Sequence, residues 1–172
     1  MDNSYRFNIS ISEKGYASKE EAEKALPYYL DKKNKIENRD VCYFSKVNVN
    51  VEELAAYIAS GHTMCGVFDA PQKFIATFKT SDRFAYTHAL FFDIDDAACT
   101  MHELLNSVPY KPTIAYRTFS DGLKGNRYRF VYVLEDYVNA KNHDYVYDRI
   151  AEQCNLPQEL DKRGCTQCYF RD

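Results

Sequence analysis

The stretch ALFFDIDD, residues 89–96, decides the fold, because an apolar run leads directly into two aspartates that lie two positions apart. Successive side chains of a strand point to opposite faces, so Asp93 and Asp95 share one face. Leu90, Phe92 and Ile94 face the opposite way, into a core. The stretch therefore predicts a buried strand that carries a pair of acids at its end.

Two carboxylates on one face of a strand repel each other unless a cation lies between them. Hard oxygen ligands at this spacing suit Mg²⁺ or Mn²⁺ that holds a polyphosphate. The alternative is an acidic loop that follows a strand and binds nothing. Residues farther along the chain favour the metal site.

Length and composition limit the possibilities. A chain of 172 residues fits one domain with a full core, or a core with a small module. The net charge is −3, so any contact with nucleic acid must be local. The 15 tyrosines and 11 phenylalanines could stack on bases, but amphipathic packing is the commoner use.

Targeting signals are not evident. No apolar run reaches the roughly 18 residues that a membrane span needs. The first residues, MDNSYRFNIS, lack the basic and apolar regions of a signal peptide. We therefore expect a cytoplasmic protein without membrane contact, whose six cysteines are reduced thiols.

Residues 1–80 predict an N-terminal α/β module. Ser18 with Glu21, and Asn50 with Glu53, form capping-box patterns that begin two helices. The expected elements are a helix from 18, a strand over 41–49, a helix over 51–61 and a strand over 73–80.

Residues 81–172 predict a second unit with the order β-α-β-β-α-β, the ferredoxin-like or RRM-like arrangement. Its expected elements are strands over 89–95, 112–120, 127–135 and 166–171, with helices over 100–108 and 140–155. The fold class is thus α+β, with an RRM-like core and an N-terminal α/β module that together form one domain.

The predicted topology gathers polar side chains at one place. The first and third strands of an RRM-like unit are antiparallel neighbours, so the end that carries Asp93 and Asp95 meets Arg127 and Arg129. The connection into the last strand carries Asp161. We therefore expect three carboxylates and two guanidiniums on an exposed sheet face. An exposed carboxylate supports no core, so replacing Asp93 by alanine is expected to leave the fold intact.

Such a cluster has the chemistry of a metal–triphosphate site. Carboxylates hold divalent ions that bridge phosphates, and arginine forks bind phosphate oxygens bidentately. Lys124, in the glycine-containing turn over 121–126, could add a phosphate contact. The alternative for Arg127 and Arg129 is a pair of surface salt bridges with the two aspartates.

The chain resembles the catalytic domain of the archaeo-eukaryotic primase superfamily, in particular the primase-polymerases of phages, plasmids and other mobile elements. The first motif of that superfamily is an apolar strand that ends in Asp-x-Asp or Asp-x-Glu, which FFDIDD at 91–96 matches. The third motif is an apolar residue followed by an acid, as in Leu160-Asp161. The similarity covers about residues 48–170.

The second motif shows a departure. In the superfamily it centres on a serine followed by a histidine, and TFSDGLKGNRYRFVYVLED at 118–136 is similar to its mobile-element forms. Ser120 is present, but Arg129 lies where the histidine would be. Arg83 lies where such proteins often carry a basic residue, whereas Gln167 replaces a frequent arginine.

The resemblance implies an RRM-like catalytic core and a DNA primase or primase-polymerase activity, which is template-dependent nucleotidyl transfer from (d)NTPs. It implies Mg²⁺ or Mn²⁺ as cofactor, a single-stranded DNA template with a primer, and a helicase domain or protein as a partner. The implied catalytic and metal-binding residues are Asp93, Asp95 and Asp161. The implied nucleotide-binding residues are Ser120, Lys124, Arg127, Arg129 and Arg83.

Other interpretations stay open. A haloacid-dehalogenase-type phosphatase also begins with an apolar strand and Asp-x-Asp, but near its N-terminus and with Thr or Val where this chain has Ala97. A non-catalytic RRM-like module would stack bases on its central strands. Zinc is not expected, because Cys165 and Cys168 have an unusual spacing from Cys154 and His143.

Overall fold

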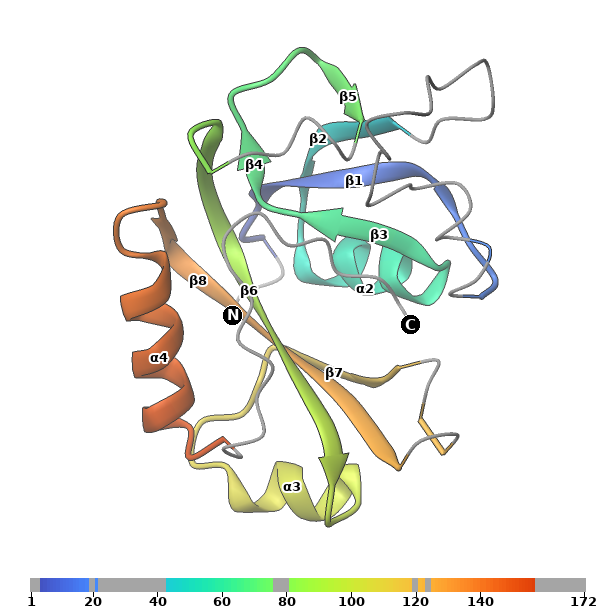
Figure 1. Ribbon diagram of the computed structural model, residues 1–172, viewed down its shortest axis with the longest axis vertical. Coiled ribbons are helices and arrows are strands. Elements are labelled where there is room, and N and C mark those ends of the chain that lie inside the picture. Colours follow the sequence, from blue (N-terminus) through green and yellow to red (C-terminus); the bar gives the residue numbers. More distant parts are fainter. Residues whose placement is uncertain are drawn as a thin grey trace, which may run out of the picture.

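The computed structural model describes residues 4–18, 21, 43–75, 81–118, 121–122 and 125–156. In this part of the chain two four-stranded sheets, paired throughout in the antiparallel sense, combine with three helices (Figure 1). The predicted α+β class is therefore confirmed. The predicted last strand, 166–171, lies outside the described residues, as does Asp161.

The first sheet belongs to the N-terminal half and has the strand order β3-β1-β2-β5. Its strands are β1 (Phe7–Gly15), β2 (Tyr43–Val49), β3 (His62–Cys65) and β5 (Lys73–Ile75). Helix α2 (Val51–Ala59) follows β2 directly. The capping box predicted for α2 is confirmed, because Asn50 accepts from the Glu53 amide at 2.9 Å and Glu53 accepts from the Asn50 amide at 3.1 Å.

The second sheet has the order β4-β6-β8-β7. Its strands are β4 (Val67–Phe68), β6 (Phe84–Ala97), β7 (Ile114–Arg117) and β8 (Asn126–Val138). Helix α3 (Met101–Ser107) joins β6 to β7, and α4 (His143–Gln153) follows β8. None of the described helices is long and apolar enough to cross a bilayer.

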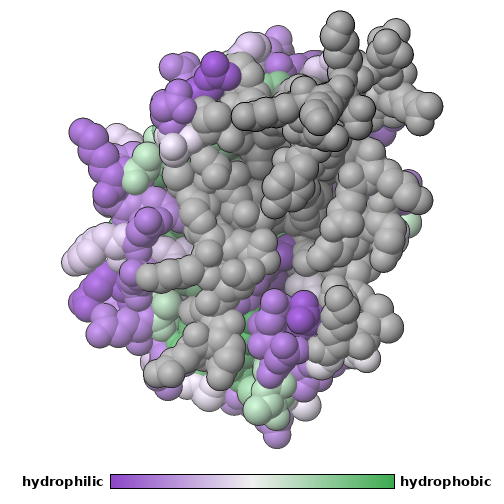
Figure 2. Space-filling view, in the orientation of Figure 1, coloured by the Kyte–Doolittle hydropathy of each residue, from purple (hydrophilic) through white to green (hydrophobic). Residues whose placement is uncertain are grey.

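One face of β6 and β8 is covered by α3 and α4, and its alternating apolar residues form a core there. Figure 1 shows α4 running beside the antiparallel pair β6 and β8. The core residues of this layer are Leu90, Phe92, Ile94, Leu104, Val108, Tyr128, Phe130, Tyr132, Tyr147, Cys154 and Leu156. The prediction that Leu90, Phe92 and Ile94 face a core is confirmed. Outside this core, hydrophilic residues line the flank formed by α4 (Figure 2).

The opposite face of β6 and β8 packs against the first sheet and α2. A second core joins Phe91 and Val131 of this face to Phe7 and Ile9 of β1 and to Leu54 of α2. Strand β4, which lies within residues 1–80, pairs with β6. The two halves of the chain thus share a core and a sheet.

Candidate functional site

The predicted meeting of acids and arginines occurs on β6 and β8. Asp93 lies directly opposite Arg129, and Arg129 in turn lies opposite Tyr116 of β7. Opposed residues in a sheet share a face, so these three side chains form one row across three strands. The next row toward the core is Phe91 with Val131 and Ile114.

Asp93 and Arg129 form a buried ion pair. Their side chains are 5% and 3% exposed, and the Arg129 Nε donates to Asp93 Oδ1. The Arg129 Nη1 donates to the Tyr116 hydroxyl at 3.3 Å, and the guanidinium carbon lies 5.8 Å from the centre of that ring. The prediction of an exposed face is wrong for this pair, because the same face continues through Phe91 into the core shared with β1.

Asp95 and Arg127 form the next row, which is partly open to solvent. Arg127 Nη1 lies 3.4 Å from Asp95 Oδ1, and Arg127 Nη2 lies 3.7 Å from Asp96 Oδ1. The exposed fractions of the side chains are 21% for Arg127, 35% for Asp95 and 66% for Asp96. The accessible part of the predicted cluster is therefore Arg127 with Asp95, and the Asp96 carboxylate lies beside them.

Asp96 joins this cluster through a β-bulge. The pairing is regular at Ile94 opposite Tyr128, and resumes at Ala97 opposite Asn126. Two residues of β6 thus lie opposite one residue of β8, the geometry of a bulge. Asp96 has a φ of 54°, a left-handed conformation that aspartate tolerates better than most residues. Strict strand alternation would turn Asp96 to the opposite face, so the sequence pattern did not predict its role.

The turn between β7 and β8 supports the cluster from the other side. Asp121 Oδ1 accepts from the Arg127 amide at 2.9 Å, and the Gly122 amide donates to the Gly125 carbonyl at 2.9 Å. Gly125 has a φ of 99°, and a Cβ there would lie 2.8 Å from Asp96 Oδ1. The absence of a side chain at Gly125 therefore lets the turn approach the Asp96 carboxylate.

Replacing Gly125 by alanine is expected to destabilise the protein more than replacing Gly122 by alanine. Both glycines have positive φ, and alanine in such a conformation costs about 1–2 kcal/mol. Only the Cβ at Gly125 also meets Asp96, because nothing lies within 4 Å of a Cβ built at Gly122. Urea unfolding of the two variants measures the difference. Equal losses would contradict the proposed approach of the turn to Asp96.

The remaining predicted residues lie apart from this cluster or beyond the described residues. Arg83 precedes β6, and an extended strand places it on the order of 30 Å from Asp93. The structure therefore does not bring Arg83 to the cluster. Ser120, Lys124 and Asp161 lie outside the described residues.

The donor chemistry of the cluster fits Mg²⁺ or Mn²⁺. Asp95 and Asp96 offer hard, anionic and accessible oxygens, whereas Asp93 Oδ1 is engaged by Arg129. Mg²⁺ is usually held by one or two carboxylates, with water and substrate phosphates as its other ligands. No group of three or more His, Cys, Asp or Glu side chains that could hold a metal occurs among the described residues. A third carboxylate from Asp161 therefore stays a prediction.

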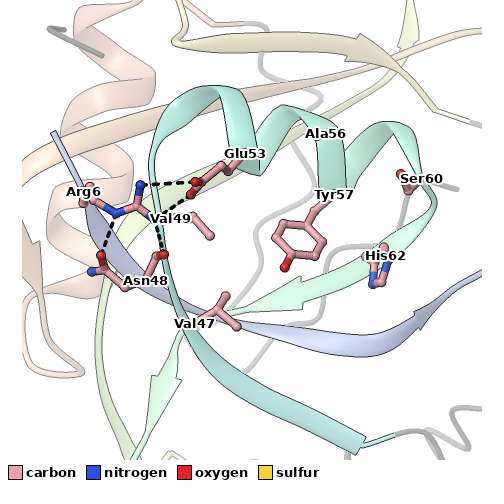
Figure 3. Close-up of a pocket in the computed structure, with 9 residues that line it drawn as sticks. All are labelled: Arg6, Val47, Asn48, Val49, Glu53, Ala56, Tyr57, Ser60 and His62. Atoms are coloured by element: carbon pink, nitrogen blue, oxygen red, sulfur yellow. Dashed lines mark hydrogen bonds and ion pairs between the residues drawn. The ribbon is translucent and has the colours of Figure 1, made fainter. Parts of the chain in front are cut away.

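A separate hollow of about 580 Å³ lies between α2 and the first sheet (Figure 3). At one end Arg6 donates to both carboxylate oxygens of Glu53, at 3.2 and 2.7 Å, and to Asn48. At the other end His62 and Tyr57 contact each other edge to face. Arg6 directly precedes β1, so its pair with Glu53 joins that end of β1 to the start of α2 and has a structural role.

Comparisons of the chain with protein-family models, with curated proteins and with solved structures find no match. Function is therefore inferred from the residues, from their geometry, and from the motif resemblance at Asp93 and Asp95. The sequence pattern had already indicated the pairing of β6 with β8. It had not indicated the roles of Tyr116 and Asp96, which depend on the register and on the bulge.

Proposed function

We propose that this chain is a primase-polymerase that transfers nucleotides from (d)NTPs to a growing strand, on a DNA template and with a divalent metal, in the replication of a mobile element. The observation that carries the proposal is the accessible cluster of Arg127 with Asp95 and Asp96 at the paired ends of β6 and β8. This is the place at which the Asp-x-Asp motif of the resembling superfamily is expected to act.

The strand order supports an RRM-like core for the second half of the chain. Strands β6, β8 and β7 are neighbours in that order, and α3 and α4 contribute to the core on one face. Strand β4 pairs with the start of β6, at Phe84 and Tyr86. The fourth strand of an RRM-like unit, with predicted residues 166–171, would lie along the rest of that edge of β6. Asp161 would then enter the cluster from the connection into that strand.

Arg127 is the residue best suited to bind the phosphates of a nucleotide. Its Nε is buried and has no hydrogen-bond partner within the described part of the chain. Because Nε is buried, a phosphate oxygen would contact the rest of the guanidinium, on a side chain that is 21% exposed. Arg129, by contrast, is engaged with Asp93 and Tyr116, and its role in this proposal is to position Asp93.

The carboxylates are assigned to the metal. Asp95 would hold Mg²⁺ or Mn²⁺ with Asp96 beside it, and Asp93 would contribute where Arg129 releases it. When bound, such an ion supplies charge neutralisation at the phosphates and a lowered pKa for the attacking 3′-hydroxyl. The bulge holds Asp95 and Asp96 together, so the two carboxylates are positioned before substrate arrives.

The two alternative functions, a non-catalytic RRM-like module and a phosphatase, need different features of the sheet face. A non-catalytic RRM-like module would stack bases on the face of β6 and β8 away from the helices. That face carries Phe91 and Val131, which are buried in the core shared with β1, so base stacking there is disfavoured. A phosphatase would use the same aspartates on a phosphate ester, and the assay below distinguishes it.

The test is incorporation of labelled nucleotides on single-stranded DNA with Mn²⁺ or Mg²⁺. We expect polymer that depends on template, on metal and on nucleotide, with pyrophosphate as the second product. Release of phosphate from simple phosphoesters, with no polymer under any condition, would instead support the phosphatase. Binding of template without metal or nucleotide binding would support the non-catalytic module.

Replacing Arg127 by glutamine is expected to weaken nucleotide binding by about 1.5–3 kcal/mol, the scale of a hydrogen bond to a charged group. Isothermal titration with a non-hydrolysable nucleotide and metal measures the loss. The matched control is Arg149→Gln, because Arg149 is also an ion-paired arginine but lies on α4. Equal affinities for the two variants would remove Arg127 from the proposed site.

A further inference from the structure

Strand β8 contains a large bulge, distant from the acidic cluster. Thr87 of β6 pairs with Val138, whereas Ala89 pairs with Val133. The four residues 134–137 of β8 therefore lie opposite the single residue His88. Bulges re-aim side chains and are frequent next to functional sites. We call these four residues the β8 bulge.

Two side chains from outside the β8 bulge hold its backbone. The Tyr5 hydroxyl lies 2.9 Å from the Leu134 carbonyl oxygen and 2.8 Å from that of Glu135. His88 Nδ1 lies 3.2 Å from the Leu134 carbonyl oxygen and 3.1 Å from the Tyr5 hydroxyl. Carbonyl oxygens only accept hydrogen bonds. The Leu134 and Glu135 carbonyls are therefore both satisfied when His88 Nδ1 carries a proton and donates to Leu134, and the Tyr5 hydroxyl donates to Glu135. The bulge is thus a fixed feature of the fold.

The β8 bulge presents an aromatic surface. The ring of Tyr137 lies 5.5 Å from that of Tyr86 and 6.3 Å from that of His88. Tyr86 and His88 contact each other at 5.8 Å with nearly perpendicular rings, and Asn8 donates to the Tyr86 hydroxyl at 3.1 Å. Tyr137 is 60% exposed, so the ring is held by its neighbours and still faces solvent.

The charge beside this surface is negative. Glu135 and Asp136 belong to the same bulge and are exposed. Burial raises the pKa of the Tyr5 hydroxyl, and the charges of Glu135 and Asp136 raise it further. The faces of aromatic rings are also negative and attract cations. A DNA backbone would be repelled here, whereas a lysine or arginine side chain would meet both a ring and a carboxylate.

We propose that the β8 bulge, with Tyr86 and His88, is a docking surface for a basic segment of a partner protein. A guanidinium or ammonium group lies over the ring of Tyr137, and Glu135 with Asp136 neutralises the charge. The surface is independent of the cluster around Arg127, so the proposal stands or fails separately from the nucleotidyl-transfer proposal.

The test uses a short arginine- and lysine-rich peptide as the probe, titrated into the ¹⁵N-labelled full chain. We expect amide shifts over residues 134–138 and around Tyr86. Tyr137→Leu, which keeps an apolar side chain, is expected to weaken binding about two- to fivefold, the range of an exposed cation–π contact. The double variant Glu135→Gln/Asp136→Asn is expected to weaken it at least as much.

The matched control lies on α4, where Tyr145 is 68% exposed and Asp144 is its neighbour in sequence. Tyr145→Leu and Asp144→Asn should leave peptide binding unchanged. Equal losses in both sets would mean that the peptide binds through net charge alone, which would overturn the proposal. Shifts at the β8 bulge with a poly-dT oligonucleotide, and none with the peptide, would also overturn it in favour of nucleic-acid binding.

Discussion

Replacing Asp93 by alanine is expected to lower the free energy of unfolding by about 3–5 kcal/mol, the cost of removing one partner of a buried ion pair. The variant leaves the Arg129 guanidinium, whose side chain is 3% exposed, without its carboxylate. The Tyr116 hydroxyl and ring still contact Arg129, but they carry no compensating charge. Urea denaturation followed by circular dichroism measures the change.

The control for this prediction removes both charges. The double variant Asp93→Leu/Arg129→Met should recover most of the stability, because a buried ion pair can be replaced by apolar residues of similar volume at little cost. An Asp93→Ala variant as stable as the wild type would contradict the buried pair. The earlier expectation that this variant leaves the fold intact is therefore corrected by the burial of Asp93.

Replacing Asp95 by asparagine is expected to reduce nucleotide incorporation about 100- to 1,000-fold, which corresponds to roughly 2.7–4 kcal/mol of lost transition-state stabilisation. The change removes one negative charge from the proposed metal site and keeps the size of the side chain. Asp95 is 35% exposed and its partner Arg127 is 3.4 Å away, so the loss in folding stability should stay within about 1 kcal/mol.

The control for Asp95 is Asp144→Asn on α4, which removes one exposed charge far along the chain from the cluster. Incorporation by this variant should equal that of the wild type. Undiminished incorporation by Asp95→Asn would remove Asp95 from the proposed metal site. A large loss of folding stability in Asp95→Asn would instead show that Asp95 has a structural role.

The cross-strand placement of the cluster could be predicted from the sequence because it depends on two simple regularities. Side chains alternate along a strand, and adjacent strands of the predicted unit are antiparallel. Together they put Asp93 and Asp95 beside Arg127 and Arg129, and the observed register agrees, with Asp93 directly opposite Arg129. The same alternation places the apolar residues of β6 and β8 on the opposite face, where α3 and α4 cover them.

The burial of that pair was missed, because it depends on β1, a strand that the sequence prediction left out. Strand β1 has the alternation of Phe7, Ile9 and Ile11, but the residues between them are Asn8 and Ser10, and asparagine has low strand propensity. Without β1 there is no second layer over β6, and its acidic face is expected to be open. The alternation itself was the signal that could have identified β1.

The contribution of Asp96 could not be predicted for a different reason. A bulge adds one residue to one strand of a pair, and its position depends on how the two strands pair rather than on either sequence alone. The close approach of Gly125 to Asp96 likewise appears only once the turn is placed against the bulge. Asp161, Ser120 and Lys124 remain sequence predictions.

A metal–nucleotide site at the ends of β6 and β8 is tested most directly by paramagnetic broadening of the ¹⁵N-labelled protein by Mn²⁺ in the presence of a nucleotide. We expect amides at 93–97 and 126–129 to broaden first, at substoichiometric Mn²⁺, and we expect Asp95→Asn to abolish this broadening. Amides around the hollow beside α2, including Tyr57 and His62, should stay sharp. Broadening that is absent from residues 93–97, or that persists unchanged in Asp95→Asn, would contradict a metal–nucleotide site at the ends of β6 and β8.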